Sequence, residues 1–323
     1  MDFIPVFIKM SELFIIIIIG FIAGRIKIIT PSGKAVLSKI IINITMPTTI
    51  LSSVMNAENL PSTTEILKIL LIAFSTYIVL FALAKLTSFM LRVKGAQKNV
   101  VEFAMIFSNV AFIGFPVTEA IFGSESLFYT SIFTMPFNLL CYSLGVGLLS
   151  GRFTKDYDTD KTTPSNVDAE KRKINWKKLF LTPALITGVL CVILGITKFQ
   201  VPVFISDTLD MIGGVTTPGA LLVIGATLSE MKIKEMFSNV KAYLFTVMQV
   251  IVTPLVMYLI YRPVCSSNPL LLGETVIITA MPVASAGTML CVEYGGDEKF
   301  MAQITFISTL ATVITIPIIS MLL

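Results

Sequence analysis

The chain has 323 residues, of which 55% are hydrophobic and only 14% are charged, and it contains no histidine. Soluble domains carry about a quarter charged residues, so the composition excludes an ordinary soluble domain and predicts an integral membrane protein. The net charge of +4 would matter for nucleic-acid binding only if it were clustered on a soluble face, whereas here it follows the expected membrane topology.

Ten apolar segments are predicted to span the membrane as helices, since a span needs about 20 mostly apolar residues. The first span lacks a preceding basic region and is followed by Arg25 and Lys27, so we expect it to be retained rather than cleaved as a signal peptide. The predicted spans are 3–24, 35–55, 66–91, 99–122, 126–149, 179–197, 203–228, 239–261, 270–294 and 300–322.

The lysines and arginines predict the orientation of these spans. All but five of the 24 fall in loops that would share one side of the membrane, and the exceptions are Lys9, Lys68, Lys85, Lys198 and Arg262. The positive-inside rule makes this side cytoplasmic. We therefore expect a multi-pass protein of the inner (plasma) membrane of the cell, with both termini outside.

A polar stretch at 151–177 divides the chain into two halves, 1–150 and 178–323, with five predicted spans each. Its mixed charge and lack of apolar periodicity predict a flexible cytoplasmic linker, with a regulatory loop as the alternative. An odd number of spans per half requires the second half to be inverted in the membrane. The predicted fold is therefore all-α, with ten transmembrane helices in two inverted five-helix repeats, a pattern typical of secondary transporters.

The fourth and ninth spans contain similar interruptions, in FSNVAFIGFPV and AMPVASAGTML. Pro116 and Pro282 each remove a backbone donor, and Gly114 and Gly287 allow the chain to bend. Non-helical backbone is tolerated at membrane depth only inside protein or beside a water-filled cavity. We expect each of these spans to be two half-helices that cross at the prolines, with simple packing kinks as the alternative.

The second half-helix of each broken span would begin near the midplane and direct its N–H groups and positive dipole end at the crossing. Two such ends could bind a carboxylate without a buried arginine, helped by neutral side-chain donors. The predicted substrate site consists of Asn109, Gly114, Pro116, Val117, Pro282, Ser285, Gly287 and Thr288.

Further polar residues lie well inside spans, where they are costly in lipid and should face the interior. Asn43, Asn138 and Gln249 would either form hydrogen bonds between helices or contact substrate. Glu119, one turn past Pro116, is the candidate for binding a coupling proton or sodium ion, with a solvated position near the outer end of its helix as the alternative.

Three other charged residues are expected to be less informative. Glu102 lies close enough to the inner interface to be solvated. Glu65 and Lys68 stand one turn apart at the start of the third span and are expected to form a local ion pair or to attract anionic substrate.

The sequence does not favour an enzyme, because it lacks histidine, a recognisable nucleophile–base pair and clustered intramembrane carboxylates. We expect no cofactor, no metal site and no disulfide framework, since the cysteines are scattered without CxxC spacing. They are Cys141, Cys191, Cys265 and Cys291.

The segment FSNVAFIGFPVTEAIFG resembles the fourth-helix motif of the auxin efflux carrier family, which includes PIN-like carriers and bacterial malate and malonate permeases. NITMPTTIL and AMPVASAG resemble the second- and ninth-helix motifs, and the resemblance covers 1–323. The short loop looks like that of the bacterial members, and Glu65 and Lys68 only loosely echo the carboxylate–lysine pair that plant members carry there.

The resemblance implies an elevator-type carrier with a scaffold of helices 1, 2, 6 and 7, often dimeric, while helices 3 to 5 and 8 to 10 move with the substrate. It assigns Asn109, Pro116 and Pro282 to the crossover. It also implies that the cavity is lined by Asn43, Asn138 and Gln249.

The predicted function is secondary transport of small organic anions, monocarboxylates or dicarboxylates. A sodium/proton antiporter or a sodium-coupled bile-acid-type symporter of the same architecture is the alternative, followed by a ligand-gated membrane sensor. The expected partners are the organic anion, a proton or sodium ion, the lipid bilayer and a second copy of the chain that packs through the scaffold helices, with no nucleic acid.

Overall fold

A computed structural model of the protein describes residues 3–55, 61–151, 183–197, 201–230, 236–294 and 296–323. Within these ranges the chain consists of helices and their connections, with one isolated antiparallel bridge. Apart from Gly151, the predicted linker at 151–177 lies outside the described residues.

The helices include several π-helical segments, labelled η. In chain order the elements are α1 (Phe3–Arg25), α2 (Pro31–Ile40), η1 (Ile41–Thr45), α3 (Met46–Met55), α4 (Thr63–Met90), α5 (Gly95–Ile106), η2 (Val110–Gly114), α6 (Phe115–Phe122), α7 (Ser126–Leu140), η3 (Cys141–Gly145), α8 (Val146–Leu149), α10 (Pro183–Thr197), α11 (Val203–Gly213), α12 (Thr216–Ser229), α14 (Val240–Val247), η5 (Met248–Val252), α15 (Thr253–Tyr261), α16 (Pro269–Thr279), α17 (Ala286–Tyr294) and α18 (Glu298–Ser320).

Seven helical stretches of the described chain are long and apolar enough to cross a membrane, as expected for an integral membrane protein. They are Ile4–Arg25, Pro31–Met55, Thr63–Met90, Ser126–Leu149, Val203–Ser229, Val240–Tyr261 and Glu298–Ser320. The remaining predicted spans contain shorter apolar helices, at Val110–Phe122, Leu185–Thr197 and Pro269–Thr279. Two of these three belong to the interrupted fourth and ninth spans.

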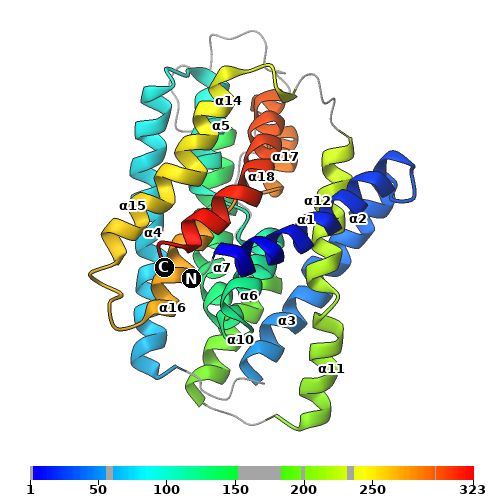
Figure 1. Ribbon diagram of the computed structural model, residues 1–323, viewed down its shortest axis with the longest axis vertical. Coiled ribbons are helices and arrows are strands. Elements are labelled where there is room, and N and C mark those ends of the chain that lie inside the picture. Colours follow the sequence, from blue (N-terminus) through cyan, green and yellow to red (C-terminus); the bar gives the residue numbers. More distant parts are fainter. Residues whose placement is uncertain (1–2, 56–60, 152–182, 198–200, 231–235, 295) are drawn as a thin grey trace.

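The helices form two packing groups (Figure 1). In the first packing group, which comprises α1, α2, α3 and α10 to α12, α1 packs along α12, and α3 packs against α10 and α11. The second packing group comprises α4 to α8 and α14 to α18, in which α4 packs against α5 and α7, and α14 and α17 pack against α18. The two groups meet where α7 contacts α10 and where α1 contacts α6 and α18.

Glycines let the backbones of α1 and α12 touch. A Cβ atom added to Gly225 would lie 2.0 Å from the Ile17 carbonyl oxygen, and one added to Gly20 would lie 2.5 Å from the Leu222 carbonyl oxygen. Small residues at a helix contact allow such close approach, which replaces hydrophobic driving force with van der Waals packing in a membrane. This contact therefore fixes α1 closely on α12.

Three prolines inside helices follow π-helical segments at the same spacing. Pro47, Pro116 and Pro254 each stand two residues after the end of η1, η2 and η5, respectively. A proline cannot donate the usual helical hydrogen bond, and a local π turn is one way in which a membrane helix accommodates it. The helices that contain Pro47 and Pro254 therefore accommodate the proline with a π turn that ends two residues before it.

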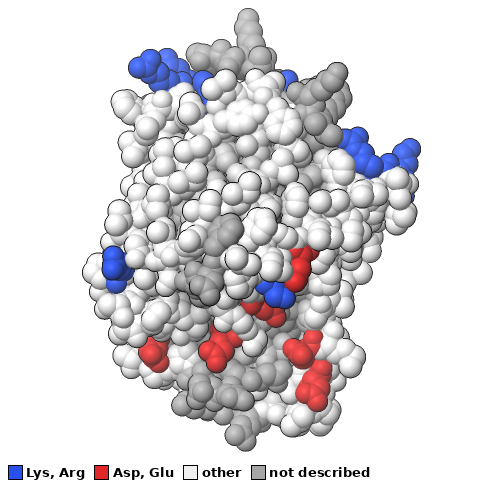
Figure 2. All heavy atoms as spheres, in the orientation of Figure 1, with Lys and Arg blue, Asp and Glu red and all other residues white. Residues whose placement is uncertain are grey.

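Charged residues separate toward the two ends of the bundle. Figure 2 shows lysine and arginine gathered at one end and most aspartate and glutamate toward the other, with one lysine or arginine beside acidic residues in between and another at the edge of the view. We call these the basic end and the acidic end. Helix α4 runs from the acidic end to the basic end, where Arg92 and Lys94 follow it (Figure 1).

Candidate functional site

Two interrupted helices cross and pair their backbones at the centre of the second packing group. Ser108, between α5 and η2, forms an antiparallel bridge with Val283, between α16 and α17. The Asn109 N–H donates to the Pro282 carbonyl oxygen at 2.7 Å, and the Ala284 N–H donates to the Phe107 carbonyl oxygen at 3.1 Å. Each broken chain thus satisfies polar groups of the other, as buried backbone requires.

Of the two predicted break positions, one agrees with the structure and the other does not. In the ninth span the break covers 280–285 and includes Pro282, as expected. In the fourth span it covers 107–109, before Gly114 and Pro116, so the prediction that these two residues make the break is wrong. The chain continues through Pro116 because the π turn of η2, closed by the Gly114 N–H to the Asn109 carbonyl oxygen at 2.9 Å, accommodates the proline.

After each break the chain continues as a second half-helix, η2 with α6 in one case and α17 in the other. The residues directly before these two half-helices bond to each other. Oδ1 of Asn109 caps η2 by accepting from the Phe112 N–H at 3.1 Å, and its Nδ2 donates to Oγ of Ser285 at 3.0 Å. Ser285 directly precedes α17, and its carbonyl oxygen accepts from Thr288 Oγ1 at 3.0 Å. Helix N-termini carry partial positive charge, so their convergence at Asn109 and Ser285 creates an electropositive spot without a charged side chain.

One side of the crossing is partly open. The bridge residues Ser108 and Val283 are buried, whereas Ala111, Ser285 and Thr288 are half-buried. The accessible side is therefore the side on which η2 and α17 begin.

The backbone of the crossing is anchored by two further serines. Ser108 Oγ donates to the Ile278 carbonyl oxygen at 3.1 Å, and the Val283 N–H donates to Oγ of Ser308 on α18 at 3.2 Å. The Phe107 ring packs against the rings of Phe103 and others, with the Phe103 centroid 5.0 Å away. This packing leaves the crossing little freedom to change shape.

Gln249 joins both broken helices, as the prediction of an interior role requires. It is 1% exposed, and its Nε2 donates to the Ala104 carbonyl oxygen at 3.3 Å and to the Met281 carbonyl oxygen at 3.5 Å. Its Oε1 has no hydrogen-bond partner within the described part of the chain. The interhelical interpretation of Gln249 therefore has direct geometric support.

The other predicted side chains lie farther from the hydrogen bonds of the crossing. Asn138 is buried on α7 and donates to the Thr134 carbonyl oxygen at 2.8 Å, while its neighbour Phe137 packs against Phe107. Asn43 is exposed on η1 and donates to the Lys39 carbonyl oxygen at 2.7 Å, so the expectation that it faces the interior is wrong.

The remaining predicted positions are buried backbone and apolar groups. Gly114, Pro116 and Val117 lie beyond the crossing, at the junction of η2 and α6. Gly287 lies in the first turn of α17, where an added Cβ would stand 3.0 Å from the Phe103 ring. These residues determine the backbone path of the half-helices. Their side chains offer no polar atom to a substrate.

Glu119 lies at the contact between the two packing groups. It is half-buried on α6, hydrogen-bonds to Thr217 of α12 and lies near Asp210 of α11. This position separates it from the crossing, which begins about ten residues earlier in the chain, at 107–109.

Glu102 is buried, so the expectation that it is solvated is wrong. Its carboxylate is 2% exposed and lies 2.6 Å from Lys85 Nζ and 4.0 Å from Lys98 Nζ, and it accepts from Ser88 Oγ at 3.2 Å. Its partners Lys85 and Ser88 belong to α4, so the carboxylate ties α5 to α4. The prediction assumed that a residue near the inner end of its helix is solvated, whereas packing against α4 buries Glu102.

Glu65 and Lys68 do not pair with each other. Glu65 forms a capping box with Ser62 at the start of α4, accepting from the Ser62 N–H at 2.9 Å. Lys68 Nζ donates to Ser267 Oγ at 3.4 Å. The predicted local ion pair is thus replaced by a helix cap and a contact with the loop before α16.

Glu274 on α16 is a buried carboxylate that the sequence analysis missed. It is 0% exposed, its Oε1 lies within hydrogen-bonding distance of Thr130 Oγ1 on α7, and its Oε2 has no hydrogen-bond partner among the described residues. The signal that could have identified it is an acidic residue inside an otherwise apolar segment, PLLLGETVIIT.

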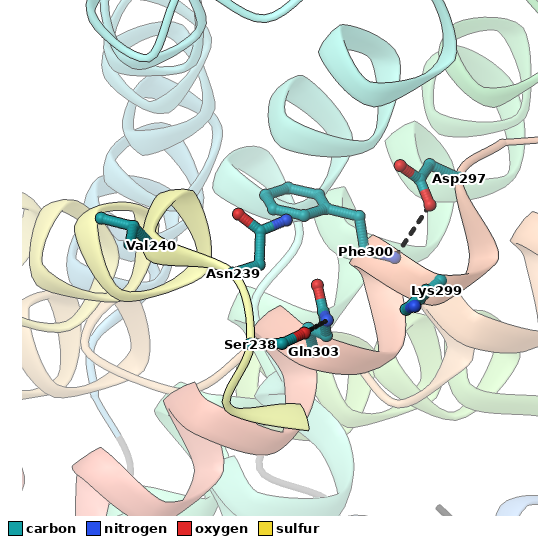
Figure 3. Close-up of a pocket in the computed structure, with 7 residues that line it drawn as sticks. All are labelled: Ser238, Asn239, Val240, Asp297, Lys299, Phe300 and Gln303. Atoms are coloured by element: carbon teal, nitrogen blue, oxygen red, sulfur yellow. Dashed lines mark hydrogen bonds between the residues drawn. The ribbon is translucent and has the colours of Figure 1, made fainter. Parts of the chain in front are cut away.

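A cavity of about 340 Å³ lies away from the crossing, between the starts of α14 and α18 (Figure 3). Asp297 on its wall caps α18 by accepting from the Phe300 N–H at 2.9 Å, and Gln303 donates to Ser238 Oγ at 3.2 Å. The predicted substrate residues do not line this cavity. Its lining residues are Ser238, Asn239, Val240, Asp297, Lys299, Phe300 and Gln303.

The described residues contain no group of three or more histidine, cysteine, aspartate and glutamate side chains that could hold a metal ion. All four cysteines are buried free thiols.

Comparison with known proteins decides the class. A family profile described as membrane transport protein matches residues 5–320, which is nearly the whole chain. The chain belongs to this family. The predicted membership of the auxin efflux carrier family of membrane transport proteins is thereby confirmed.

Two relatives of this membrane transport protein are archaeal. An uncharacterized transporter of Methanothermobacter thermautotrophicus is 23% identical over 314 residues, covering 96% of this chain and 95% of the relative. An uncharacterized transporter of Methanocaldococcus jannaschii is 24% identical over 306 residues, covering 94% of each. Both alignments are nearly full length, so the similarity extends over the whole membrane transport protein.

Proposed function

We propose that this membrane transport protein is a secondary transporter of small organic anions, bound as carboxylates at the crossing. The observation that carries the proposal is the hydrogen bond between Asn109 and Ser285, which brings the N-terminal ends of two half-helices to one half-open place. The N–H groups of Val110, Phe112 and Gly287 already donate within the protein. The other N–H groups of these first turns have no partner within their helix, and we propose that these hold the anion.

The chemistry of the crossing favours a carboxylate over a cation. Asn109, Ser285 and Thr288 offer neutral donors beside two positive dipole ends, and the residues predicted to bind substrate include no acidic side chain. Hydrogen bonds to an ionised acceptor are roughly twice as strong as neutral ones. A substrate with one or two carboxylates can thus be held without arginine or lysine.

We further propose that the protein spans the plasma membrane ten times, as two inverted five-helix repeats with both termini outside. The antiparallel bridge between Ser108 and Val283 supports the inverted relation, because it pairs the fourth and ninth spans symmetrically about one point. This relation aligns Ser108 with Val283 rather than Pro116 with Pro282.

The transport mechanism proposed is an elevator. The second packing group contains the whole crossing and would move with the substrate, while the first packing group, fixed by the α1–α12 contact, would serve as scaffold and as the surface of a homodimer. Rigid packing of the crossing suits this mechanism, because the site would move as a unit.

The test is uptake of labelled malate, malonate and indole-acetate into proteoliposomes under imposed proton, sodium and voltage gradients. Wild type should take up at least one of these carboxylates. Asn109→Ala should reduce that uptake by about 10- to 100-fold, the loss expected when a hydrogen bond to a charged group, worth about 1.5–3 kcal/mol, is removed.

Asn268→Ala is the matched control, because Asn268 caps α16 in the same way, accepting from the Leu271 N–H at 3.0 Å, but lies outside the crossing. Uptake that falls equally in both variants would contradict a binding role for Asn109. Cation exchange without any carboxylate dependence would favour the antiporter, and carboxylate binding without flux would favour the sensor.

A further inference from the structure

Glu274 is a titratable group that the proposed anion site does not use. It lies on α16, and the break starts six positions later, at Ala280, about 9 Å along a helix axis. The side chain is 0% exposed and belongs to the same packing group as the crossing.

The surroundings of Glu274 provide no positive charge. Within the described chain, no lysine or arginine nitrogen lies within 4.0 Å of its carboxylate, since the ion pairs formed there involve Glu12, Glu102 and Glu230 instead. A buried carboxylate without a counter-ion is costly, and such groups become neutral by binding a proton. The site thus suits a proton better than an anion.

The hydroxyl of Thr130 can bond to Glu274 in either protonation state of the carboxyl group. Thr130 Oγ1 has three partners: the Ser126 carbonyl oxygen at 3.0 Å, Thr118 Oγ1 at 2.8 Å and Glu274 Oε1. A hydroxyl has one hydrogen and two lone pairs. Thr130 can donate this hydrogen to an ionised Glu274, or donate it to the Ser126 carbonyl oxygen and accept from a protonated Glu274. The pair therefore suits a carboxyl group that binds and releases a proton.

No other titratable group near α16 forms an ion pair with Glu274 within the described residues. Tyr129 of α7 is close enough to interact electrostatically with Glu274. Its hydroxyl accepts a hydrogen bond from Asn268 Nδ2 at 3.3 Å. The remaining titratable side chains on elements packed against α16 form no ion pair or hydrogen bond with Glu274 in the described ranges. They are Glu65, Lys68, Tyr77 and Lys85 on α4, Glu119 on α6, Tyr258 and Tyr261 on α15, and Glu298 and Lys299 on α18.

We propose that Glu274 is the proton-binding site that couples carboxylate transport to the proton gradient. This inference rests on the proposed function and replaces Glu119 as the coupling group. One proton binds the Glu274 carboxylate on the side of higher proton concentration, moves with the substrate as the second packing group moves, and leaves to water on the other side. The Thr130 hydroxyl then turns its hydrogen from Ser126 to the ionised carboxylate.

The experiment uses full-length protein in proteoliposomes that contain a pH-sensitive dye, with labelled malate or malonate as substrate. Wild type should acidify the lumen in proportion to substrate uptake and should accumulate substrate when the outside is acidic. Wild type that carries carboxylate with no proton movement would overturn the inference while leaving the proposed function intact. Absence of all carboxylate flux would instead overturn the proposed function.

Glu274→Gln retains the shape of the protonated acid and cannot release a proton. It should therefore keep exchange of labelled for unlabelled carboxylate within about twofold of wild type, and lose at least about tenfold of the uptake driven by the proton gradient. Glu125→Gln, the same change at an exposed site before α7, should behave as wild type. Retained proton-driven uptake in Glu274→Gln, or loss of that uptake in Glu119→Gln alone, would overturn the assignment.

Thr130→Val provides a second test if Glu274→Gln does not fold. It keeps the carboxyl group and removes the hydroxyl that bonds to it, so it should move the pH midpoint of proton-driven uptake while preserving coupling. An unchanged midpoint would contradict the proposed role of the Thr130–Glu274 pair.

Discussion

Lys85 and Glu102 form an ion pair whose two members differ in exposure, with 47% of the lysine side chain exposed against 2% of the glutamate. Removing the more accessible partner would leave a buried carboxylate with only the distant Lys98 nitrogen, at 4.0 Å, and Ser88. Most of the desolvation free energy of this pair comes from burying Glu102. Loss of Lys85 should therefore destabilise the fold more than loss of a lysine from a surface pair.

We expect Lys85→Met to lower the free energy of unfolding by about 1–3 kcal/mol, because it leaves a buried charge undercompensated. Lys9→Met is the matched control, since Lys9 and Glu12 form a pair in which both side chains are more than half exposed. The measurement is thermal unfolding followed with a thiol-reactive fluorophore, which reports exposure of the four buried cysteines. Equal losses in the two variants would contradict this account.

At the residue scale the sequence predicted better which polar side chains would form hydrogen bonds inside the protein than which way side chains would point. Asn109, Ser285 and Gln249 were identified because amides and hydroxyls inside apolar segments are costly unless they are satisfied within the protein. Asn43 and Glu102 were misplaced because a side chain's direction depends on which neighbouring helix it meets. Glu274 was missed although it stands in an apolar segment, and its bond to Thr130, 144 positions away, could not be predicted from the sequence.

At the scale of helices, apolar length predicted the limits of the seven long apolar helices of the described chain to within a few residues. It was not sufficient to place the break in the fourth span. That break is held by hydrogen bonds to Pro282 and from Ala284, which no local pattern reveals. Pro116 indicated an irregular helix correctly, but the irregularity is the π turn of η2.

A side-chain atom added at the centre of the α1–α12 contact should destabilise the protein, because the two backbones already touch there. Gly225→Ala places a Cβ 2.0 Å from a backbone oxygen, so one helix must move, and we expect a loss of stability of about 1–3 kcal/mol or more. Gly214→Ala, whose Cβ would meet nothing closer than 3.6 Å, should remain within about 1 kcal/mol of wild type. Thermal unfolding of both variants checks this, and an unaffected Gly225→Ala would mean that the helices lie farther apart.

For the whole molecule, the elevator mechanism requires the two packing groups to move relative to each other. Ser131 on α7 and Cys191 on α10 face each other across their boundary, with Oγ and Sγ 3.3 Å apart. Ser131→Cys should therefore form a disulfide with Cys191 on oxidation, stop carboxylate exchange, and recover after reduction.

The control for this cross-link lies within the first packing group, where the Oγ1 atoms of Thr49 and Thr216 are 2.8 Å apart. A disulfide between cysteines at these two positions should leave exchange intact, because α3 and α12 are expected to stay together. Exchange that continues after complete oxidation of Ser131→Cys would show that α7 and α10 do not separate during transport.

The most direct test of the central claim is equilibrium binding of labelled malate or malonate to purified Asn109→Asp. This change keeps the oxygen that caps η2 and adds a negative charge at the crossing, and two like charges about 4 Å apart repel by about 4 kcal/mol at an effective dielectric constant of 20. We predict at least a 100-fold (about 2.8 kcal/mol) loss of affinity, with Asn268→Asp unchanged. Equal affinity in wild type and Asn109→Asp would place the anion elsewhere and contradict the account.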